Sequence, residues 1–183
     1  ITSVDRDDLP DGGASFWARV ITEVKKENPG ITIEALIPDF DGKKENIQKV
    51  IDTSPEVLSH NLETVRRLTP LIRTKAKYER SLSVVRYIAG SGIPAKSGLM
   101  LGLGETEEEI LETMDDLLDA GCSILTLGQY LKPAEGYMEP VAYIPPEKFE
   151  EYRKTGLSRG FRFVESGPLV RSSWHAEKHI EAR

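Results

Sequence analysis

The fold of this chain is decided by the stretch AKSGLMLGLGETEEEILETMDDLLDAGCSILTLGQ, residues 95–129. Nearly continuous apolar runs at 95–102 and 124–129 predict two strands that are buried on both faces. Between them, Thr106 and Glu109 have the spacing of a capping box, and Gly121 provides a stop, which predicts a helix over 106–119. A strand, a helix and a strand in this order predict a parallel pair joined by a right-handed crossover.

The same alternation continues in both directions along the chain. Apolar periodicity predicts helices at 15–27, 44–52, 62–68, 78–89 and 146–158. It predicts further strands at 31–37, 57–61 and 161–165, and the end of another at 1–4. Strands that alternate with helices indicate an α/β fold with a parallel sheet.

Polar residues just beyond the predicted strand ends favour one kind of parallel sheet. They are Asp5, Asp39, Asn61, Glu63, Glu105 and Gln129. In a (β/α) barrel the carboxyl ends of all strands form one rim that carries the active site. An open doubly wound sheet uses mainly the crevice at its switch point, so it does not need every strand end to be polar. We therefore expect part of a (β/α) barrel.

Composition limits the classes of function. The 183 residues are 39% hydrophobic and 30% charged, which fits one globular domain, and the net charge of −6 argues against a nucleic-acid partner. We find neither a transmembrane stretch nor a signal peptide, so we expect no membrane partner and a cytoplasmic location, or the mitochondrial matrix in a eukaryote. Cys122 is the only cysteine, which excludes an internal disulfide and a cluster held by several cysteines of this chain.

Four motifs have both a functional and a structural interpretation. Residues 2–13, TSVDRDDLPDGG, place four acids before two glycines that let backbone approach a ligand, although acids also suit turns and helix caps. Residues 60–63, HNLE, are either part of a site or a strand end followed by a cap. Residues 171–173, RSS, either bind an anion or form an irregular tail. Lys96 is either a Schiff-base lysine, as in aldolases, or an ion-paired lysine.

Seven stretches in a fixed order carry a resemblance over essentially the whole chain. They are TSVDRDDLPDGG (2–13), IPDF (37–40), HNLETV (60–65), YERSL (78–82), KSGLMLGLGET (96–106), LTLGQYLKP (125–133) and SGPLVRSSWHA (166–176). In these stretches and their spacing the chain resembles the lipoyl synthase family of radical SAM enzymes. Radical SAM proteins in general share only the glycine-rich strand.

The resemblance implies a fold and a reaction. The fold is a partial (β/α) TIM-type barrel of the radical SAM kind, missing its first strand or strands, over residues 1–165, with a C-terminal extension at 166–183. The reaction inserts two sulfurs at C6 and C8 of an octanoyl chain held on a lysine of a carrier. A 5′-deoxyadenosyl radical, formed from S-adenosyl-L-methionine at a 4Fe-4S cluster, removes the hydrogens. A second, auxiliary 4Fe-4S cluster is the sulfur donor.

The resemblance also implies partners and an incomplete site. The partners are an octanoylated lipoyl carrier domain or H-protein, and a reductant such as ferredoxin or flavodoxin. The family has two three-cysteine motifs upstream of the TSVD strand, at which this chain begins. We therefore expect the reading frame to continue upstream of Ile1 with CxxxxCxxxxxC and CxxxCxxC, and the 183-residue chain alone to be inactive.

Matching positions carry implied roles toward S-adenosylmethionine. Ser3 and Asp5 are candidates for contact with its methionine amino group, and Arg80 and Lys96 for contact with its carboxylate. Asn61 is expected to meet the ribose. The remaining candidates lie at the ribose or on the adenine side, and they are Glu63, Gly98, Gly102, Glu105, Gln129 and Tyr130.

One residue is implied as a metal ligand, and no side chain is expected to be catalytic by itself. In the family the auxiliary cluster takes a serine ligand from an RSSY motif, which is RSSW at 171–174 here. We assign this ligand to Ser173, with Ser172 as the alternative. Trp174 keeps an aromatic side chain at the tyrosine position but lacks the hydroxyl.

Two other functions stay open. One is a Schiff-base barrel aldolase that uses Lys96. The other is a non-catalytic, carrier-binding paralogue that has lost its clusters.

Overall fold

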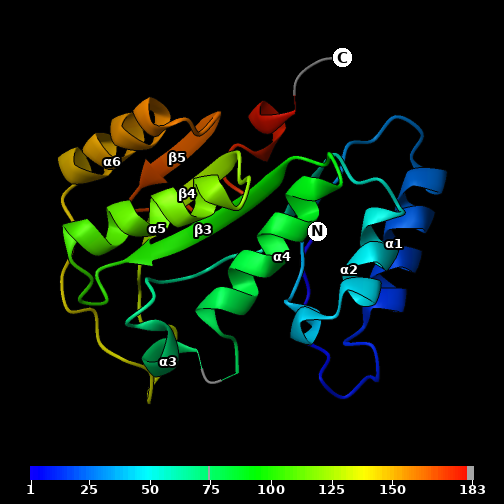
Figure 1. The fold of residues 1–183 in the computed structure, drawn as a ribbon, viewed down its shortest axis with the longest axis horizontal. Coiled ribbons are helices and arrows are strands. Elements are labelled where there is room, and N and C mark those ends of the chain that lie inside the picture. The colour runs from blue at the N-terminus through cyan, green and yellow to red at the C-terminus, as the bar shows by residue number, and fades with distance from the viewer. Residues whose placement is uncertain (74, 181–183) are drawn as a thin grey trace.

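The computed structural model describes residues 1–73 and 75–180 and contains, within them, a five-stranded parallel sheet of order β1-β2-β3-β4-β5 (Figure 1). The strands are β1 Glu34–Leu36, β2 Val57–Ser59, β3 Ala95–Leu101, β4 Ile124–Gln129 and β5 Phe163–Gly167. The helical elements are α1 Ala14–Glu27, η1 Phe40–Gly42, α2 Lys44–Ile51, α3 Thr69–Ile72, α4 Tyr78–Gly90, α5 Glu107–Asp119, α6 Pro146–Arg159 and η2 Ala176–His179. Consecutive strands pair in parallel, as in part of a (β/α) barrel.

The strand register separates two faces of the sheet. Residues paired across strands share a face, so Gly98 of β3 lies on the same face as Thr126 of β4. We call this the inner face. Its described members include Glu34, Leu36, Ser59, Lys96, Gly98, Met100, Thr126, Gly128 and Glu165. Small and polar side chains therefore predominate on it.

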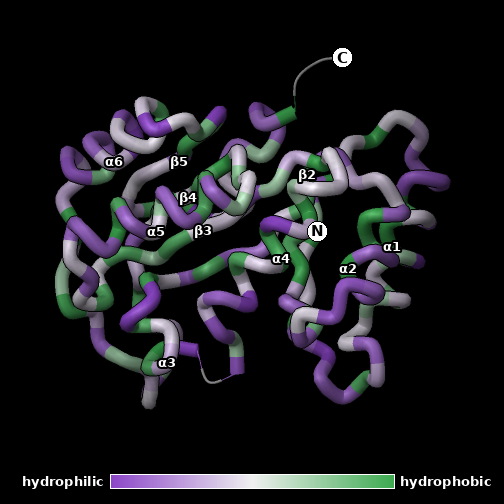
Figure 2. The backbone as a smooth tube through the Cα atoms, in the orientation of Figure 1, coloured by the Kyte–Doolittle hydropathy of each residue, from purple (hydrophilic) through white to green (hydrophobic). Residues whose placement is uncertain are grey.

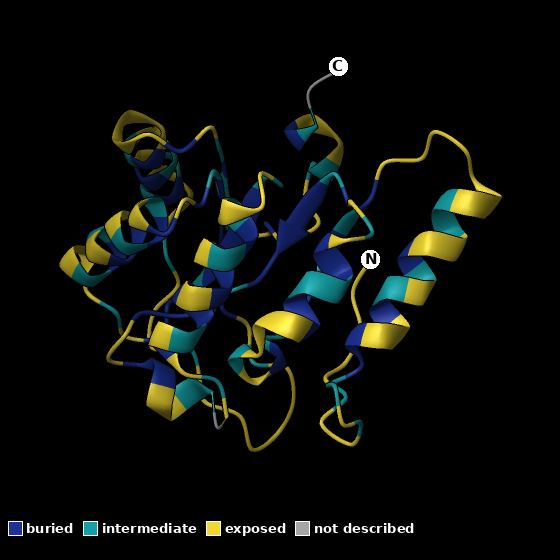
Figure 3. Cartoon of the chain, turned by 45° about the vertical axis from the view of Figure 1, so that its right-hand side comes forward, coloured by how far each residue is buried: buried dark blue, intermediate teal, exposed yellow. Residues whose placement is uncertain are grey.

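The opposite face is apolar and is covered by helices. It carries Leu58, Leu99, Leu125 and Leu127, which are buried in the main hydrophobic core. The helices turn their buried sides toward the sheet and their polar sides toward solvent (Figures 2 and 3). Burial of each leucine side chain stabilises the fold by roughly 1.5–3 kcal/mol. The helix face thus supports the sheet and leaves the inner face available for a site.

Two predicted elements differ from the structure. The helix predicted at 62–68 is wrong, because the backbone there pairs with the end of β3. Glu63 N–H donates to the Gly98 carbonyl at 2.9 Å, and the Glu63 carbonyl accepts from Met100 N–H at 2.8 Å. Glu63 also has a positive φ of 68°, and the next helical turn is delayed to α3. The strand end predicted at 1–4 is, within the described residues, a single bridge between Thr2 and Leu36.

The strongest helix signal in the sequence is confirmed. Helix α5 begins at a capping box in which Thr106 Oγ1 accepts from Glu109 N–H at 3.3 Å and Glu109 Oε2 accepts from Thr106 N–H at 2.8 Å. Both interactions occupy donors that a helix start otherwise leaves to solvent. The strand predicted at 124–129 is β4, with the same bounds.

Replacing Thr106 by alanine is expected to lower the free energy of unfolding by about 1 kcal/mol, because one half of the capping box is lost. Urea unfolding followed by circular dichroism measures this change. Thr22→Ala is the matched control, since Thr22 is exposed within α1 and donates to the Ala18 carbonyl at 2.8 Å. We expect that control to be neutral or stabilising. Equal losses in the two variants would contradict the capping role.

Candidate functional site

A cavity of about 270 Å³ opens at the carboxyl end of the inner face, and we call it the rim cavity. Strand ends and the C-terminal segment form its walls. The lining residues are Leu36, Asn61, Glu63, Gly98, Leu99, Met100, Thr126, Gly128, Gln129, Leu131, Val170, Arg171 and Ser172. The rim cavity therefore brings together four predicted site residues, namely Asn61, Glu63, Gly98 and Gln129.

Gly98 and Asn61 shape the polar part of the rim cavity. A Cβ atom on Gly98 would lie 2.6 Å from Thr126 Oγ1 and 3.1 Å from Asn61 Oδ1. Asn61 Nδ2 donates to Glu63 Oε1 at 3.2 Å, whereas Asn61 Oδ1 is buried without a hydrogen-bond partner among the described residues. Leaving such an acceptor unsatisfied costs about 1–3 kcal/mol. A ligand hydroxyl or N–H group would satisfy it.

Glu63 adds a partly desolvated carboxyl group to this wall. Burial raises the pKa of Glu63, and the hydrogen bond from Asn61 opposes that shift. A carboxylate offers two acceptor oxygens and suits a pair of neighbouring ligand hydroxyls. Asn61 and Glu63 together therefore form an acceptor-rich wall.

The glycine-rich turn after β3 holds a loop above the sheet. Gly102 has a φ of +98°, and a Cβ atom on it would lie 2.3 Å from the Ala142 carbonyl oxygen. The Gly102 carbonyl accepts from Val141 N–H at 2.8 Å. Glu105 closes the turn by accepting from the N–H groups of Gly102 at 2.5 Å and Leu103 at 2.9 Å. In this structure Gly102 contacts the loop at 130–145 directly, and Glu105 holds the turn that contains Gly102.

Gln129 and Tyr130 hold the same loop from β4. Gln129 Nε2 donates to the Ala142 carbonyl at 3.0 Å, and Gln129 Oε1 accepts from Ile144 N–H at 2.9 Å. Tyr130 is buried and its hydroxyl donates to the Met138 carbonyl at 2.9 Å. Gln129 also lines the rim cavity, and Leu131 continues that wall. The contribution of these residues to an adenine side stays a prediction.

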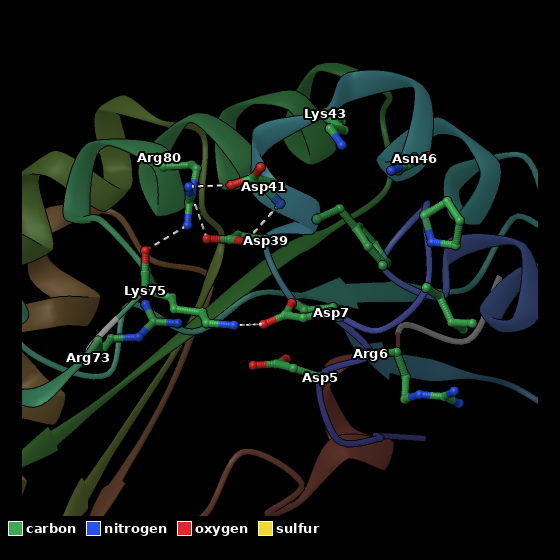
Figure 4. A pocket seen from close by; sticks show the side chains of 16 residues that line it. Asp5, Arg6, Asp7, Asp39, Asp41, Lys43, Asn46, Arg73, Lys75 and Arg80 are labelled. Atoms are coloured by element: carbon green, nitrogen blue, oxygen red, sulfur yellow. Dashed lines mark hydrogen bonds and ion pairs between the residues drawn. The ribbon is translucent and has the colours of Figure 1, made fainter.

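A larger cavity of about 580 Å³ lies between the N-terminal loop and η1, and we call it the loop cavity (Figure 4). Asp5 and Arg80, both predicted ligand contacts, line it. Arg80 Nε donates to Asp39 Oδ2 at 2.7 Å. Arg73 also lines the loop cavity, and its Nη1 donates to the Asn61 carbonyl at 3.3 Å. Arg73 therefore connects the loop cavity to the wall of the rim cavity.

Other residues of the 2–13 motif have local contacts. Asp11 accepts from Ser15 N–H at 2.9 Å and from Gly13 N–H at 3.0 Å, at the start of α1. Its hydrogen bonds with Ser15, together with one from Lys49, hold the pKa of Asp11 well below the usual range. Ser3 is exposed, donates to the Val4 carbonyl at 3.0 Å and lines neither the rim cavity nor the loop cavity.

Lys96 lies on the inner face but deeper than the rim cavity. Its side chain is fully buried, and Nζ lies 2.8 and 3.0 Å from the two carboxylate oxygens of Glu34. Burial lowers the pKa of Lys96, and Glu34 opposes that shift. Burial alone would raise the pKa of Glu34, but His179 and Lys96 outweigh it and keep that pKa below its ordinary value. We take the pair as charged at neutral pH because both oxygens contact Nζ.

The serines of the RSSW motif lie in different surroundings. Ser172 lines the rim cavity, and the neighbouring Ser173 is exposed. Cys122 is buried, and burial raises the pKa of its thiol to about 12. Within residues 1–73 and 75–180, no group of three or more His, Cys, Asp or Glu side chains could hold a metal ion.

Thr126 and Gly128 also line the rim cavity, although the sequence did not predict them as site residues. Thr126 and Gly128 alternate with leucines along β4, and this period-two pattern of small or polar residues is a signal that could have identified them. Arg171 comes from the C-terminal segment, whose position the local sequence does not encode. From the sequence, Arg171 was either a possible anion contact or part of an irregular tail.

No helix in the described part of the chain is long and apolar enough to cross a bilayer.

A sequence profile of the radical SAM superfamily matches residues 1–117. The lipoyl synthase of Phocaeicola vulgatus is 60% identical over 181 residues, which cover 99% of this chain and 64% of that protein. The lipoyl synthase of Treponema denticola is 58% identical over 180 residues, covering 98% of this chain and 62% of that protein. The chain thus spans less than two thirds of the length of these curated relatives.

Two solved structures share the fold at low sequence identity. A domain of pyruvate-formate lyase-activating enzyme from Bacteroides vulgatus superposes with a TM-score of 0.67 at 16% identity, covering 90% of this chain and 97% of that chain. Methylornithine synthase superposes with a TM-score of 0.63 at 15% identity, covering 86% of this chain and 53% of that one. At these identities the comparison supports the fold alone.

Proposed function

The chain belongs to the radical SAM superfamily, and on that premise we propose that it forms the barrel portion of a lipoyl synthase. The proposed reaction inserts two sulfurs at C6 and C8 of a protein-bound octanoyl-lysine. The observation that carries the proposal is the 60% identity over 181 residues to the lipoyl synthase of Phocaeicola vulgatus. Because 64% of that relative is matched, the proposed activity concerns these residues together with the cluster-binding part of a complete synthase.

The hydrogen-bond acceptors and the open space of the rim cavity suit S-adenosylmethionine. Asn61 Oδ1, buried without a partner among the described residues, and the Glu63 carboxyl would accept ribose hydroxyls. Gly98 leaves the space that a side chain would fill, so a nucleoside can approach the strand. Of the two cations predicted for the methionine carboxylate, Arg80 lines the loop cavity, where it also pairs with Asp39 and Asp41, whereas Lys96 lines neither cavity. We therefore favour Arg80, with Asp5 nearby as the candidate for the amino group.

Apolar walls beside these polar groups suit an acyl chain. Leu36, Met100, Leu131 and Val170 line the same cavity. When bound, S-adenosylmethionine and a 4Fe-4S cluster supply the one-electron chemistry that breaks unactivated C–H bonds. The residues of this chain would orient the acyl chain and exclude water and stray hydrogen donors.

The clusters and partners complete the proposal. We propose that two 4Fe-4S clusters take their cysteine ligands from outside these residues, and that Ser173 is the one ligand from this chain to the auxiliary cluster. Ser172, its neighbour, lines the rim cavity, so the motif adjoins the proposed acyl site. The acyl donor is an octanoylated lipoyl carrier domain or H-protein, and the electrons come from a reductant such as ferredoxin or flavodoxin.

The aldolase alternative has less support. A Schiff-base lysine needs a carbonyl substrate beside Nζ. Lys96 lines neither the rim cavity nor the loop cavity, and its ammonium contacts both oxygens of Glu34. We therefore do not favour a Schiff base at this position.

A chimera tests the proposed function. In it, the residues of this chain replace the matching segment of the Phocaeicola vulgatus lipoyl synthase. After anaerobic reconstitution with iron and sulfide, we expect lipoyl product from an octanoyl-lysine peptide at a rate within about tenfold of the parent enzyme. Mass spectrometry of the peptide measures the product. A chimera that folds and binds its clusters but makes no product would overturn the proposal and favour a non-catalytic paralogue.

The 183-residue chain on its own is the control. It contains one cysteine, so we expect no stoichiometric 4Fe-4S cluster and no lipoyl product after the same reconstitution. Iron content and the absorbance of the cluster report the first outcome. A full cluster on this chain alone would contradict the assignment of its ligands to other residues.

A further inference from the structure

The C-terminal segment at 168–179 contacts the inner face of the sheet near both ends of the strands, and its last turn, η2, is visible above the sheet in Figure 1. At the carboxyl end, the Pro168 carbonyl accepts from Gln129 N–H at 3.4 Å. Next to it, the Val170 carbonyl oxygen lies 2.3 Å from the position that a Cβ atom on Gly128 would take. At the other end of the segment, His179 lies beside Lys96 near the start of β3. The segment is thus in contact with the sheet at both of its ends.

His179 makes its contacts with three different strands. Nδ1 lies 3.4 Å from Lys96 Nζ on β3 and 3.8 Å from Glu34 Oε2 on β1. Nε2 lies 3.9 Å from Glu165 Oε1 on β5. The imidazole also packs against the Phe163 ring, with centroids 5.5 Å apart. The side chain is 0% exposed. A histidine in the last turn of a terminal segment therefore lies at the centre of a buried charged cluster.

Hydrogen bonding orients this imidazole. An ammonium group has only donors, so Lys96 Nζ donates and His179 Nδ1 accepts. Nε2 lies 3.9 Å from the Glu165 carboxylate, which is beyond hydrogen-bond distance, and it is buried without a hydrogen-bond partner among the described residues. Removing the ring would leave buried space beside three charged groups, whereas a glutamine could still accept from Lys96.

Most of the segment between its two ends is exposed. Ser173, Trp174, Glu177 and Lys178 are all exposed. Val170 and His179 are the described residues of 168–179 that are buried. Arg171 and Ser172 follow Val170 directly and line the rim cavity. Arg171 and Ser172 therefore lie between the two buried residues of the segment, Val170 and His179.

We propose that His179 is a positioning residue that anchors the C-terminal segment to the inner face and thereby sets the positions of Arg171 and Ser172 in the rim cavity. This assignment goes beyond the ligand contacts considered above, because His179 lines neither cavity. The consequence for S-adenosylmethionine rests on the proposed function. The anchoring itself depends on the contacts of His179 alone.

Hydrogen exchange on the full 183-residue chain tests the anchor. We expect His179→Leu to speed amide exchange in peptides from 168–179 by about tenfold, while exchange in α5 stays unchanged. His179→Gln should restore most of the protection, because it keeps an acceptor for Lys96. Lys178→Ala, at the neighbouring exposed position, should have no effect. Unchanged exchange at 168–179 in His179→Leu would overturn the proposal, as would an equal increase throughout the chain.

The chimeric synthase tests the positioning role. We expect His179→Leu to raise the KM for S-adenosylmethionine by about tenfold, and His179→Gln to return it toward the starting value. A KM unchanged by His179→Leu would overturn the positioning role. If the chimera with native His179 makes no product, the proposed function fails, whereas the hydrogen-exchange result still decides whether His179 is the anchor.

Discussion

Lys96→Met is expected to lower the free energy of unfolding by about 3–5 kcal/mol, because it leaves the Glu34 carboxylate buried without its cation. The methionine chain fills a similar volume, so the loss reports charge rather than a cavity. Both Glu34 oxygens lie within 3.0 Å of Lys96 Nζ, and the lysine side chain is fully buried. Urea unfolding of the 183-residue chain at about pH 7 measures the change.

The pH dependence of this loss has a definite sign. In the native protein the pKa of Glu34 is held below its ordinary value, so its contribution to stability is present above the unfolded pKa and is lost as pH falls through the folded one. In Lys96→Met, burial is no longer opposed by the lysine, so we expect the pKa of Glu34 to be higher than in the native protein. The two proteins should therefore approach each other in stability as pH falls from about 7 to about 4.5.

Two further variants distinguish a buried ion pair from a general effect of removing lysine. Lys49→Met is the matched control, since Lys49 Nζ lies 3.0 Å from Asp11 but its side chain is 40% exposed, and we expect a loss of about 0–1 kcal/mol. Adding Glu34→Gln to Lys96→Met should recover most of the loss, because no charge is then left without a partner. If Lys96→Met lowered the free energy of unfolding no more than Lys49→Met does, the buried ion pair would stabilise the protein no more than an exposed one.

This pair also shows what could and could not be predicted from the sequence. Strand alternation along 95–101 indicates that Lys96 and Gly98 share a face, and the structure agrees. The partners of Lys96 could not be predicted, because Glu34 is 62 positions away and His179 is 83 positions away. Local patterns encode periodicity and caps, which is why the start of α5 was correct. They do not encode which distant side chains meet across a sheet.

The prediction of a helix at 62–68 was wrong for a similar reason, namely a contact between distant parts of the chain. The sequence there has a helical preference, but the backbone of Glu63 is used by β3 through hydrogen bonds with Gly98 and Met100. A tertiary pairing therefore replaces a local preference. The same pairing holds Asn61 and Glu63 in the wall of the rim cavity. The motif therefore predicted Asn61 and Glu63 as site residues, but it did not predict the backbone conformation that places them in the cavity wall.

Gly98→Ala is expected to reduce mainly ligand affinity and Gly102→Ala mainly stability, although both glycines belong to one motif. At Gly98 the new methyl group would meet the side chains of Thr126 at 2.6 Å and Asn61 at 3.1 Å, which can move. We therefore expect a stability loss of about 1–2 kcal/mol, but a loss of S-adenosylmethionine affinity of about 100-fold in the chimera, because the cavity is filled and Asn61 is displaced.

At Gly102 the obstacle is backbone. The methyl group would lie 2.3 Å from the Ala142 carbonyl oxygen, and the φ of +98° disfavours any side chain. We expect a loss of about 2–5 kcal/mol in the free energy of unfolding, with faster hydrogen exchange in the loop at 130–145.

Gly90→Ala is the matched control for both glycine variants. Gly90 ends α4, and a Cβ atom on it would meet nothing within 4 Å, so we expect a gain or loss below about 1 kcal/mol and unchanged affinity. Equilibrium binding of S-adenosylmethionine to the reconstituted chimera and urea unfolding of the 183-residue chain separate the two effects. If Gly98→Ala bound the ligand as tightly as Gly90→Ala, the rim cavity would not be the nucleoside site. If Gly102→Ala were as stable as Gly90→Ala, the loop at 130–145 would not depend on the close approach at Gly102.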